Sequence, residues 1–291
     1  MLTLDGSGAG AATFNNKIIA TELDISGNID IDGTSNLDVV DIDGAVDMAS
    51  TLQVDGAITG SSTIVGSTIN GVGIKYNITN FSNSLLISND AGTGTLDAAS
   101  NNTGLGHEVF DDLTSGDENT GVGFQALTKL TTGLQNVAIG SYALTANTTG
   151  GSNVAIGRSS LEANTTGDNN TAIGKHALLS NTTSDLNTVI GSLAGDAITT
   201  GAANVIVGYN SGGALTTGGS NTVVGTNALI TQTTIGSNTA IGSGAMEANT
   251  NGDKAVAVGA GAMAANTTAV HNTAIGFSAL SANTTGGNNT A

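Results

Sequence analysis

Residues 136–152 read NVAIGSYALTANTTGGS, and residues 153–169 repeat the pattern as NVAIGRSSLEANTTGDN. Asn recurs every 17 residues from position 102 to position 289, and Ala255 is the one substitution in this column. With Asn as position 1, the consensus is N-T-A-I-G-x-x-A-L-x-A-N-T-T-G-x-x. Regular repetition of one short unit indicates a solenoid, in which each repeat forms one coil that stacks on the next.

Two segments of the unit are predicted to be strands. Side chains alternate between the faces of a strand, so positions 2 and 4 of T-A-I-G share one face, and positions 9, 11 and 13 of A-L-x-A-N-T share another. We therefore expect Ile at position 4 and Leu at position 9 to fill the interior of each coil. In three central repeats these residues are Ile139, Ile156, Ile173, Leu144, Leu161 and Leu178.

Two corners are predicted to close the coil. The segment N-T-T-G is one turn, because Asn and Gly tolerate positive φ. Position 5 is the other, because it is always Gly, where a Cβ would clash or φ is positive. The repeated Gly residues include Gly140, Gly157, Gly174 and Gly191. The constant Thr of position 13 includes Thr148, Thr165 and Thr182, and we expect Thr and Asn ladders to pair their polar groups along the stack.

Alternation also places positions 3 and 8 on the outside of the coil, although both are small and apolar. Two such columns on a surface predict a close partner, most simply further copies of the chain around an axis. The alternative is that Ala is simply tolerated on a surface. The predicted interface residues are Ala138, Ala143, Ala155, Ala172 and Ala177.

The predicted fold class is all-β. We expect a stacked-coil β-solenoid or β-roll with 17-residue coils over residues 84–291, preceded by a β-helical shaft of short strands, in an intertwined homotrimer. A helix is excluded, because each unit contains Gly and a Thr-Thr-Gly break. Eleven coils at about 4.8 Å each would form a rod about 50 Å long.

Three segments are predicted. Residues 1–71 form the shaft, in which short alternating runs are punctuated by Asp-Gly turns. Residues 72–101 form a junction, where SLLISNDAG at 84–92 resembles a degenerate first coil offset by one residue from the 17-residue register. Residues 102–291 form the repeat β-roll, which stops within a unit.

Composition excludes several classes of function. The 291 residues include 43 Gly but no Pro, Cys or Trp, and the net charge is −17. With six Lys and Arg in total there is no basic patch to neutralise phosphates, so we expect no nucleic-acid binding. No run of 18 apolar residues occurs, so we expect no membrane span.

No motif predicts an enzyme or a cofactor. The sequence NIDIDG at 28–33 resembles the start of a calcium loop, but the twelfth loop position is Val39 rather than Glu. Its carboxylates fit a solvent-facing strand better, although rows of Asp could meet in a trimer and attract a cation. These weak metal candidates are Asp30, Asp32, Asp41 and Asp43. The three His residues fall in three different columns, which does not favour a metal site.

The whole chain resembles a known family. Residues 5–49, which begin DGSGAGAATFNNKIIA, and the NTAIGxxALxxNTTG repeats are similar to tail-fibre proteins of marine, cyanophage-like bacteriophages. This resemblance implies a homotrimeric β-helical shaft in the virion, partnered by other tail proteins and by a host cell-surface glycan or protein. Such fibres also carry an attachment domain and a C-terminal chaperone, so we expect this chain to be a fragment of a longer protein.

Two alternatives remain open. The AIGxxAxA core is similar to the head repeats of trimeric autotransporter adhesins, which would place the protein at a bacterial cell surface. A solenoid that binds ice or another surface through its Thr column is the remote alternative. A polysaccharide depolymerase would need a pair of carboxylates in a groove, whereas acids occur singly in the repeats.

Overall fold

The computed structural model describes residues 68–69, 72–78, 81–88 and 97–291, with side chains for 81–88 and 97–291. The chain divides between residues 61 and 62 into two compact units, and the described residues belong to the second unit, Ser62–Ala291. Most of the predicted shaft and the four Asp residues proposed as weak metal candidates lie outside the described residues.

The described residues form one sheet of 15 strands and contain no helix. The first four strands are β1 (Thr68–Ile69), β2 (Val72–Ile78), β3 (Phe81–Ser88) and β4 (Ala99–Ser100). Each following coil contributes one strand of three residues. These strands are β5 (Thr103–Leu105), β6 (Thr120–Val122), β7 (Val137–Ile139), β8 (Val154–Ile156), β9 (Thr171–Ile173), β10 (Thr188–Ile190), β11 (Val205–Val207), β12 (Thr222–Val224), β13 (Thr239–Ile241), β14 (Val256–Val258) and β15 (Thr273–Ile275).

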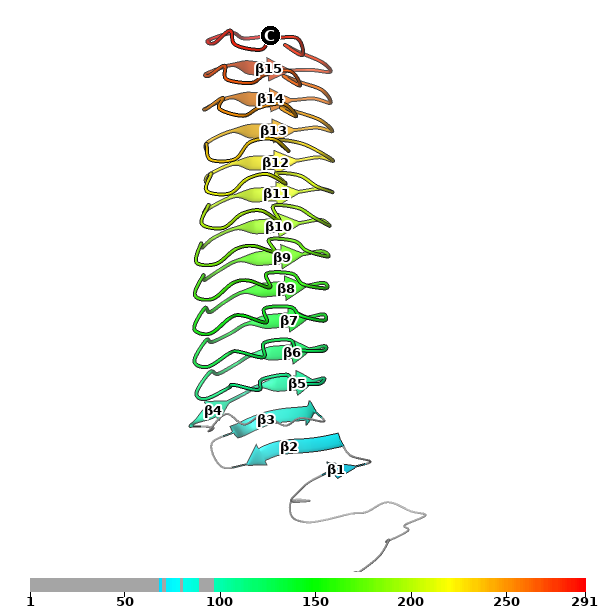
Figure 1. Cartoon of the computed structure of the whole chain (residues 1–291), viewed down its shortest axis with the longest axis vertical. Coiled ribbons are helices and arrows are strands. Elements are labelled where there is room, and N and C mark those ends of the chain that lie inside the picture. The colour runs from blue at the N-terminus through cyan, green and yellow to red at the C-terminus, as the bar shows by residue number, and fades with distance from the viewer. Residues whose placement is uncertain (1–67, 70–71, 79–80, 89–96) are drawn as a thin grey trace, which may run out of the picture. The chain divides into compact units, whose positions relative to one another are not determined.

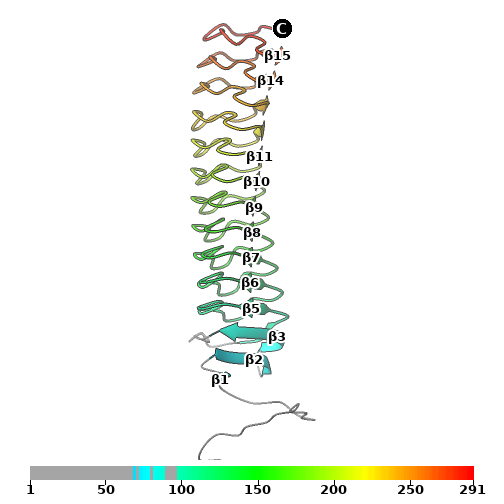
Figure 2. The ribbon, with the colours of Figure 1, turned by 90° about the vertical axis from the view of Figure 1, so that its right-hand side faces the viewer.

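The predicted β-solenoid is confirmed. From β5 to β15 every strand pairs in parallel with the next, and each residue pairs with the residue 17 positions later, as Ala138 does with Ala155. Figures 1 and 2 show the coils stacked one above another with their strands in a single row. Positions 2 to 4 form the strand because they hold Thr, Val, Ile and Ala, of which the β-branched residues favour the extended backbone.

The first coil joins the stack through β3 and β4. Leu85 pairs in parallel with Thr103, which is 18 residues later, so the repeat is offset here by the one residue that the sequence indicates. Ser84 stands where the repeats have Asn, and its hydroxyl accepts a hydrogen bond of 2.7 Å from the Asn102 N–H. Strand β2 then pairs antiparallel with β3, which covers the edge of the first coil.

The prediction of a second strand in each coil is wrong. The segment from Ser141 to Ala146 is a series of turns, in which Tyr142 and Leu144 have φ values of 63° and 51°. Non-Gly residues rarely adopt this left-handed conformation, which costs roughly 1–3 kcal/mol each. Axial hydrogen bonds compensate: the Tyr142 N–H donates to Phe124 O and the Leu144 N–H to Ser160 O.

These turns reverse the predicted orientation of the strand. Leu144 is fully buried as expected, but so are Ala138 and Ala143, while Ile139 is 40% exposed. Ile156 and Ile173 are likewise only partly buried, so the prediction that Ile at position 4 fills the interior is wrong. The prediction that position 3 and position 8 Ala face outward is wrong too, because they lie in the core. These residues are Ala138, Ala143, Ala155, Ala172 and Ala177, all 0% exposed within one chain.

The limited space inside the coil explains why the strand turns Ala inward and Ile outward. Because φ is positive at positions 7 and 9, strict alternation fails there, and the residues of positions 8 and 9 both face inward. The interior also holds the Asn side chains of positions 1 and 12, such as Asn136 and Asn147. Little room is left beside the strand, so its inward residue is small and the larger Ile of position 4 faces out.

Where one core position has a smaller side chain than in the other coils, a neighbouring core position has a larger one. In the coil that starts at Asn187, Leu is replaced at position 9 by Gly195, and Asn is replaced at position 12 by Ile198. A Cβ on Gly195 would lie 3.0 Å from Ile198 Cδ1, so the larger side chain occupies the vacated space. In the first coils the bulk of Phe110 is instead matched by Gly104, whose added Cβ would lie 2.9 Å from the Phe110 ring.

An Asn ladder runs through the core at position 1. Asn153 Nδ2 donates to Asn136 Oδ1 at 3.2 Å and to Gly167 O at 2.8 Å. Asn153 Oδ1 in turn accepts from the Asn170 N–H at 2.9 Å and from Asn170 Nδ2 at 3.2 Å. Each buried amide is therefore paired with the coils on both sides, as buried polar groups require.

A second ladder runs along the Thr of position 13. Thr148 Oγ1 donates to Thr165 O at 3.1 Å, and Thr165 Oγ1 donates to Thr182 O at 2.9 Å. The Thr148 N–H donates to the same carbonyl of Thr165 at 2.9 Å. The hydroxyls of this column are therefore used within the stack.

The constant Gly of position 5 meets both conditions that the sequence predicts. Gly140 has a φ of 138°, and a Cβ there would lie 2.5 Å from Gly157 O in the next coil. Gly157, Gly174 and Gly191 have φ values of 129°, 135° and 143°. In the N-T-T-G segment, by contrast, neither Asn147 nor Gly150 has positive φ. At Gly150 an added Cβ would lie 2.5 Å from Asn147 Oδ1 and Gly167 O, so a larger residue there requires a local shift, as in the coils that carry Ser184, Ile235 and Ala269 at this position.

Candidate functional site

The outward side of the strands forms a continuous uncharged surface, which we call the sheet face. It consists of positions 2 and 4 in eleven coils, and these positions contain only Thr, Val, Ile and Leu. The exposed members at position 4 include Leu105, Ile139, Ile190, Ile241 and Ile275. Because adjacent strands lie about 4.8 Å apart, the two columns form a regular, flat grid of β-branched side chains.

Charged side chains flank the sheet face without entering it. On one side the chain passes the Gly corner and reaches position 6, which holds Arg158 and Lys175. On the other side, positions 16 and 17 hold Asp168, Asp185 and Lys254. The sheet face is thus an uncharged strip along a chain whose net charge is −17.

A row of rings and cations follows the corner after the strands. The rings of His107 and Phe124 stack with centroids 5.3 Å apart, and Phe124 meets Tyr142 edge-to-face at 5.3 Å. In the next two coils, Arg158 Nη1 lies 3.5 Å from His176 Nε2. The contacts in this row connect successive coils, while Phe124 itself stays 41% exposed.

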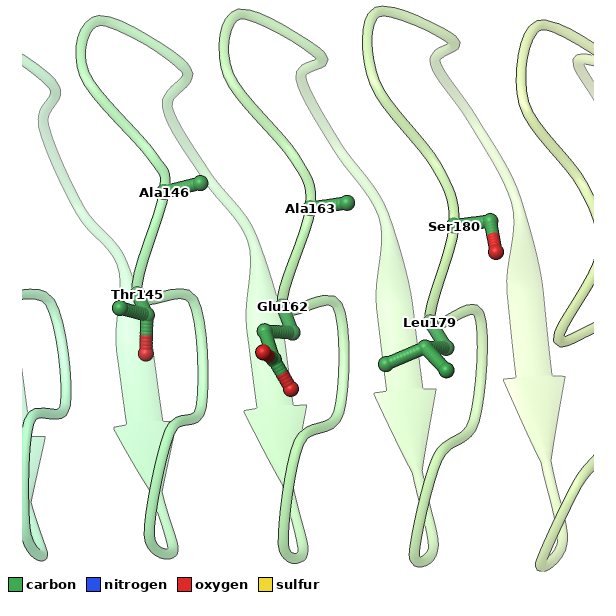
Figure 3. Close-up of a pocket in the computed structure, with 6 residues that line it drawn as sticks. All are labelled: Thr145, Ala146, Glu162, Ala163, Leu179 and Ser180. Atoms are coloured by element: carbon green, nitrogen blue, oxygen red, sulfur yellow. The ribbon is translucent and has the colours of Figure 1, made fainter.

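A shallow groove of about 450 Å³ lies on the turn segment across the core from the strands. Figure 3 shows Thr145, Glu162 and Leu179 at the same place in three successive coils, with smaller residues beside them. The groove holds one carboxylate, that of Glu162, and no second carboxylate lines it. Such a site lacks the pair of acids that glycoside hydrolysis uses.

Asp196 occupies the next place in this column. Burial raises the pKa of the Asp196 carboxyl above its ordinary value of 3.8. Hydrogen bonds from the backbone N–H groups of Asp196 and Ala197 and the charge of His176 oppose this rise. A raised pKa alone does not make a catalytic acid, and structural positions show such shifts too.

Within residues 81–88 and 97–291, no three His, Asp or Glu side chains come together as ligands for a metal ion. His107, His176 and His271 lie in different coils, and His107 stacks on Phe124. The part of the chain that the structure describes also contains no helix long and apolar enough to cross a lipid bilayer.

Sequence reasoning missed the sheet face as a surface, because it assigned position 4 to the interior. A signal was present in the columns themselves. Position 3 accepts Gly, Ala, Val and Ile as the neighbouring core residues change, which is typical of a packed interior. After Leu105 in the first coil, position 4 is Val or Ile in every coil regardless of those changes, which is typical of a surface that is defined independently of the core.

No protein-family model, no curated protein and no solved structure matches this chain.

Proposed function

We propose that the protein is a structural fibre segment, the shaft of a bacteriophage tail fibre that spaces or presents a host-recognition tip. One observation carries the proposal: the same coil is stacked eleven times, in one register, from β5 to β15. A body built in this way has a constant cross-section, and its length is set by the number of coils. This is what a spacer requires.

The contacts between coils support this role. The Asn ladder, the Thr ladder and the parallel strands all connect one coil to the next, as the bonds between Asn153 and Asn170 do. One coil has little core of its own, so its stability depends on its neighbours, and the stack behaves as a cooperative rod. The stack thereby holds its first and last coils at a fixed separation.

The resemblance of the repeats to marine phage tail fibres supports the placement in a virion. On this proposal the chain is one copy in a homotrimer, joined to other tail proteins, and its tip contacts a host glycan or protein. The alternative is an adhesin head of the trimeric autotransporter type, whose lateral surface binds directly. The hydroxyls of Thr148 and Thr165 donate within the stack, which does not favour the ice-binding alternative.

Electron microscopy of the purified chain tests the spacer directly. We expect rods in which the eleven coils span about 50 Å. Insertion of a second copy of residues 136–203, which comprise four coils, should lengthen the rod by about 19 Å without changing its width. Rounded particles, or rods whose length does not respond to the insertion, would contradict the proposal.

A binding assay separates the spacer from the adhesin. The fluorescently labelled chain is incubated with a panel of marine bacteria that includes cyanobacteria, and retained fluorescence is measured. A spacer without its tip should not be retained above a labelled control protein of similar charge. Saturable retention that is lost on substitution of surface residues in the repeats would favour the adhesin.

A further inference from the structure

We infer that the sheet face is the surface through which copies of this chain associate, parallel and in register, with the number of copies, three, taken from the proposed fibre. This inference rests on the proposed fibre, and it replaces the interface expected at positions 3 and 8. Those Ala residues are buried within a single chain and cannot reach a partner. The outward columns at positions 2 and 4 hold larger side chains, are uncharged, and are continuous along the stack.

The exposure of this surface is the first argument. Ile139, Ile190 and Ile241 are 40%, 37% and 36% exposed, although each stands on a strand in an ordered sheet. With the half-buried Val and Thr of position 2, the exposed strip is continuous over eleven coils. Stable interfaces bury about 800 Å² on each partner, which requires a long, continuous surface of this kind.

Charge is the second argument. A basic partner would find no acid on the sheet face, and an acidic partner no cation, because positions 2 and 4 are uncharged in all eleven coils. Two copies that each carry a net charge of −17 repel one another over most of their surface. The sheet face is where they can approach closely, because it brings no like charges together.

Periodicity is the third argument, and it identifies the occupant as the same chain. The side chains of position 4 recur at the spacing of parallel strands, about 4.8 Å, along the entire stack. A partner must match this spacing over eleven coils to fill the gaps between them. Another copy, rotated about an axis parallel to the stack, matches it at every coil, so that Ile156 of each copy meets Ile156 of the others. Cyclic symmetry of this kind closes the assembly and leaves no exposed strip.

The test compares charges placed on two faces. The double variant Ile156→Lys/Ile173→Lys places two ammonium groups on adjacent coils of the sheet face. The matched control, Thr149→Lys/Thr166→Lys, places them on adjacent coils at exposed positions of the N-T-T-G turn. Light scattering should give the mass of three 28.3 kDa chains for the wild type and the control, and of one chain for the sheet-face variant.

Cross-linking keeps the test decisive if the double variant does not fold. The chain has no Cys, so Ile173→Cys introduces a single thiol on the sheet face, and Thr166→Cys is its control. Packed sheets lie about 10 Å apart, which a short bis-maleimide spans. We expect covalent dimers from Ile173→Cys at low protein concentration and none from Thr166→Cys.

Each outcome bears on one proposal. A wild type with the mass of one chain overturns the inference, whereas the rod length measured by microscopy still decides the spacer. A trimer that persists in the folded double variant, or Ile173→Cys that gives no covalent dimer, places the contact elsewhere and also overturns the inference. Failure to form rods of the expected length counts against the proposed fibre, whatever the mass.

Discussion

Replacement of Asn153 by Ala should destabilise the stack by about 3 kcal/mol, because it removes one step of the Asn ladder. Asn153 Oδ1 accepts from the Asn170 N–H and from Asn170 Nδ2 at 2.9 and 3.2 Å. Ala offers no acceptor to either buried donor. The Asn170 N–H loses its partner, whereas Asn170 Nδ2 still donates to Ser184 O at 2.8 Å and loses the acceptor of its second hydrogen. Each buried hydrogen left without an acceptor costs about 1–3 kcal/mol, so these two give the stated magnitude.

The loss of the hydrogen bonds that the Asn153 side chain donates costs less than the loss of those that it accepts. Asn153 Nδ2 also donates to Gly167 O, but that carbonyl accepts a second hydrogen bond of 3.0 Å from Asn164 Nδ2 and stays paired. The effect therefore arises mainly in the next coil. Amide hydrogen exchange should show the largest loss of protection at Asn170, rather than at residue 153 itself.

The assay is denaturant unfolding followed by circular dichroism, with hydrogen exchange as the local readout. Asn251→Ala is the matched control, because Asn251 is exposed and only its backbone N–H bonds to Thr267 O. That control should change the unfolding free energy by less than about 0.5 kcal/mol. If Asn153→Ala changes the unfolding free energy as little as the control does, and Asn170 remains protected, then the Asn ladder does not stabilise the stack through these buried hydrogen bonds.

Three further predictions follow from the same geometry. Ala255 interrupts the ladder, so Ala255→Asn should restore an acceptor for Asn272. The free energy of unfolding should rise by about 1 kcal/mol, which a higher unfolding midpoint would show. A lower midpoint would show that the site is too tightly packed for the amide. Gly140→Ala should cost more than 3 kcal/mol, because φ is 138° and the Cβ would lie 2.5 Å from a carbonyl oxygen. Gly261→Ala should cost about 1 kcal/mol, because φ is 66° and the Cβ would make only an ordinary contact of 3.5 Å with Ser278 Oγ. Since burial raises the folded-state pKa of Asp196 above 3.8, the fold binds this proton more tightly and loses stability as pH rises from 3.8 through the folded pKa. Asp196→Asn should therefore stabilise the fold at pH 7 and lose this advantage below pH 3.8. Thermal unfolding measured over this pH range tests the prediction. Equal melting temperatures of the variant and the wild type at pH 7 would refute it.

The solenoid and its ladders could be predicted from the sequence, because these features depend only on the 17-residue period. A column that recurs every 17 residues must align in a stack, so the pairing of Ala138 with Ala155 and the axial bonds of Asn153 follow from the spacing. The corner at Gly140 also follows, since a constant Gly needs a backbone reason.

The orientation of side chains could not be predicted by the same reasoning. It depended on whether the segment after Gly140 is extended, and the positive φ values of Tyr142 and Leu144 show that it is not. Nothing about Tyr or Leu as residue types favours that conformation. It arises from axial hydrogen bonds that exist only once neighbouring coils are stacked. The assignment of Ile139 to the interior failed for this tertiary reason.

The direction of the axial hydrogen bonds has a mechanical consequence. Every bond that holds one coil to the next, such as those between Asn153 and Asn170, points along the stack. A tensile load applied at the two ends of the stack therefore opens a few of these bonds at a time, by peeling a terminal coil, instead of shearing many at once. Each released coil of 17 residues extends by up to about 60 Å. Under tension the stack would yield in discrete steps and dissipate energy, while under compression the same coils stay in contact and transmit force.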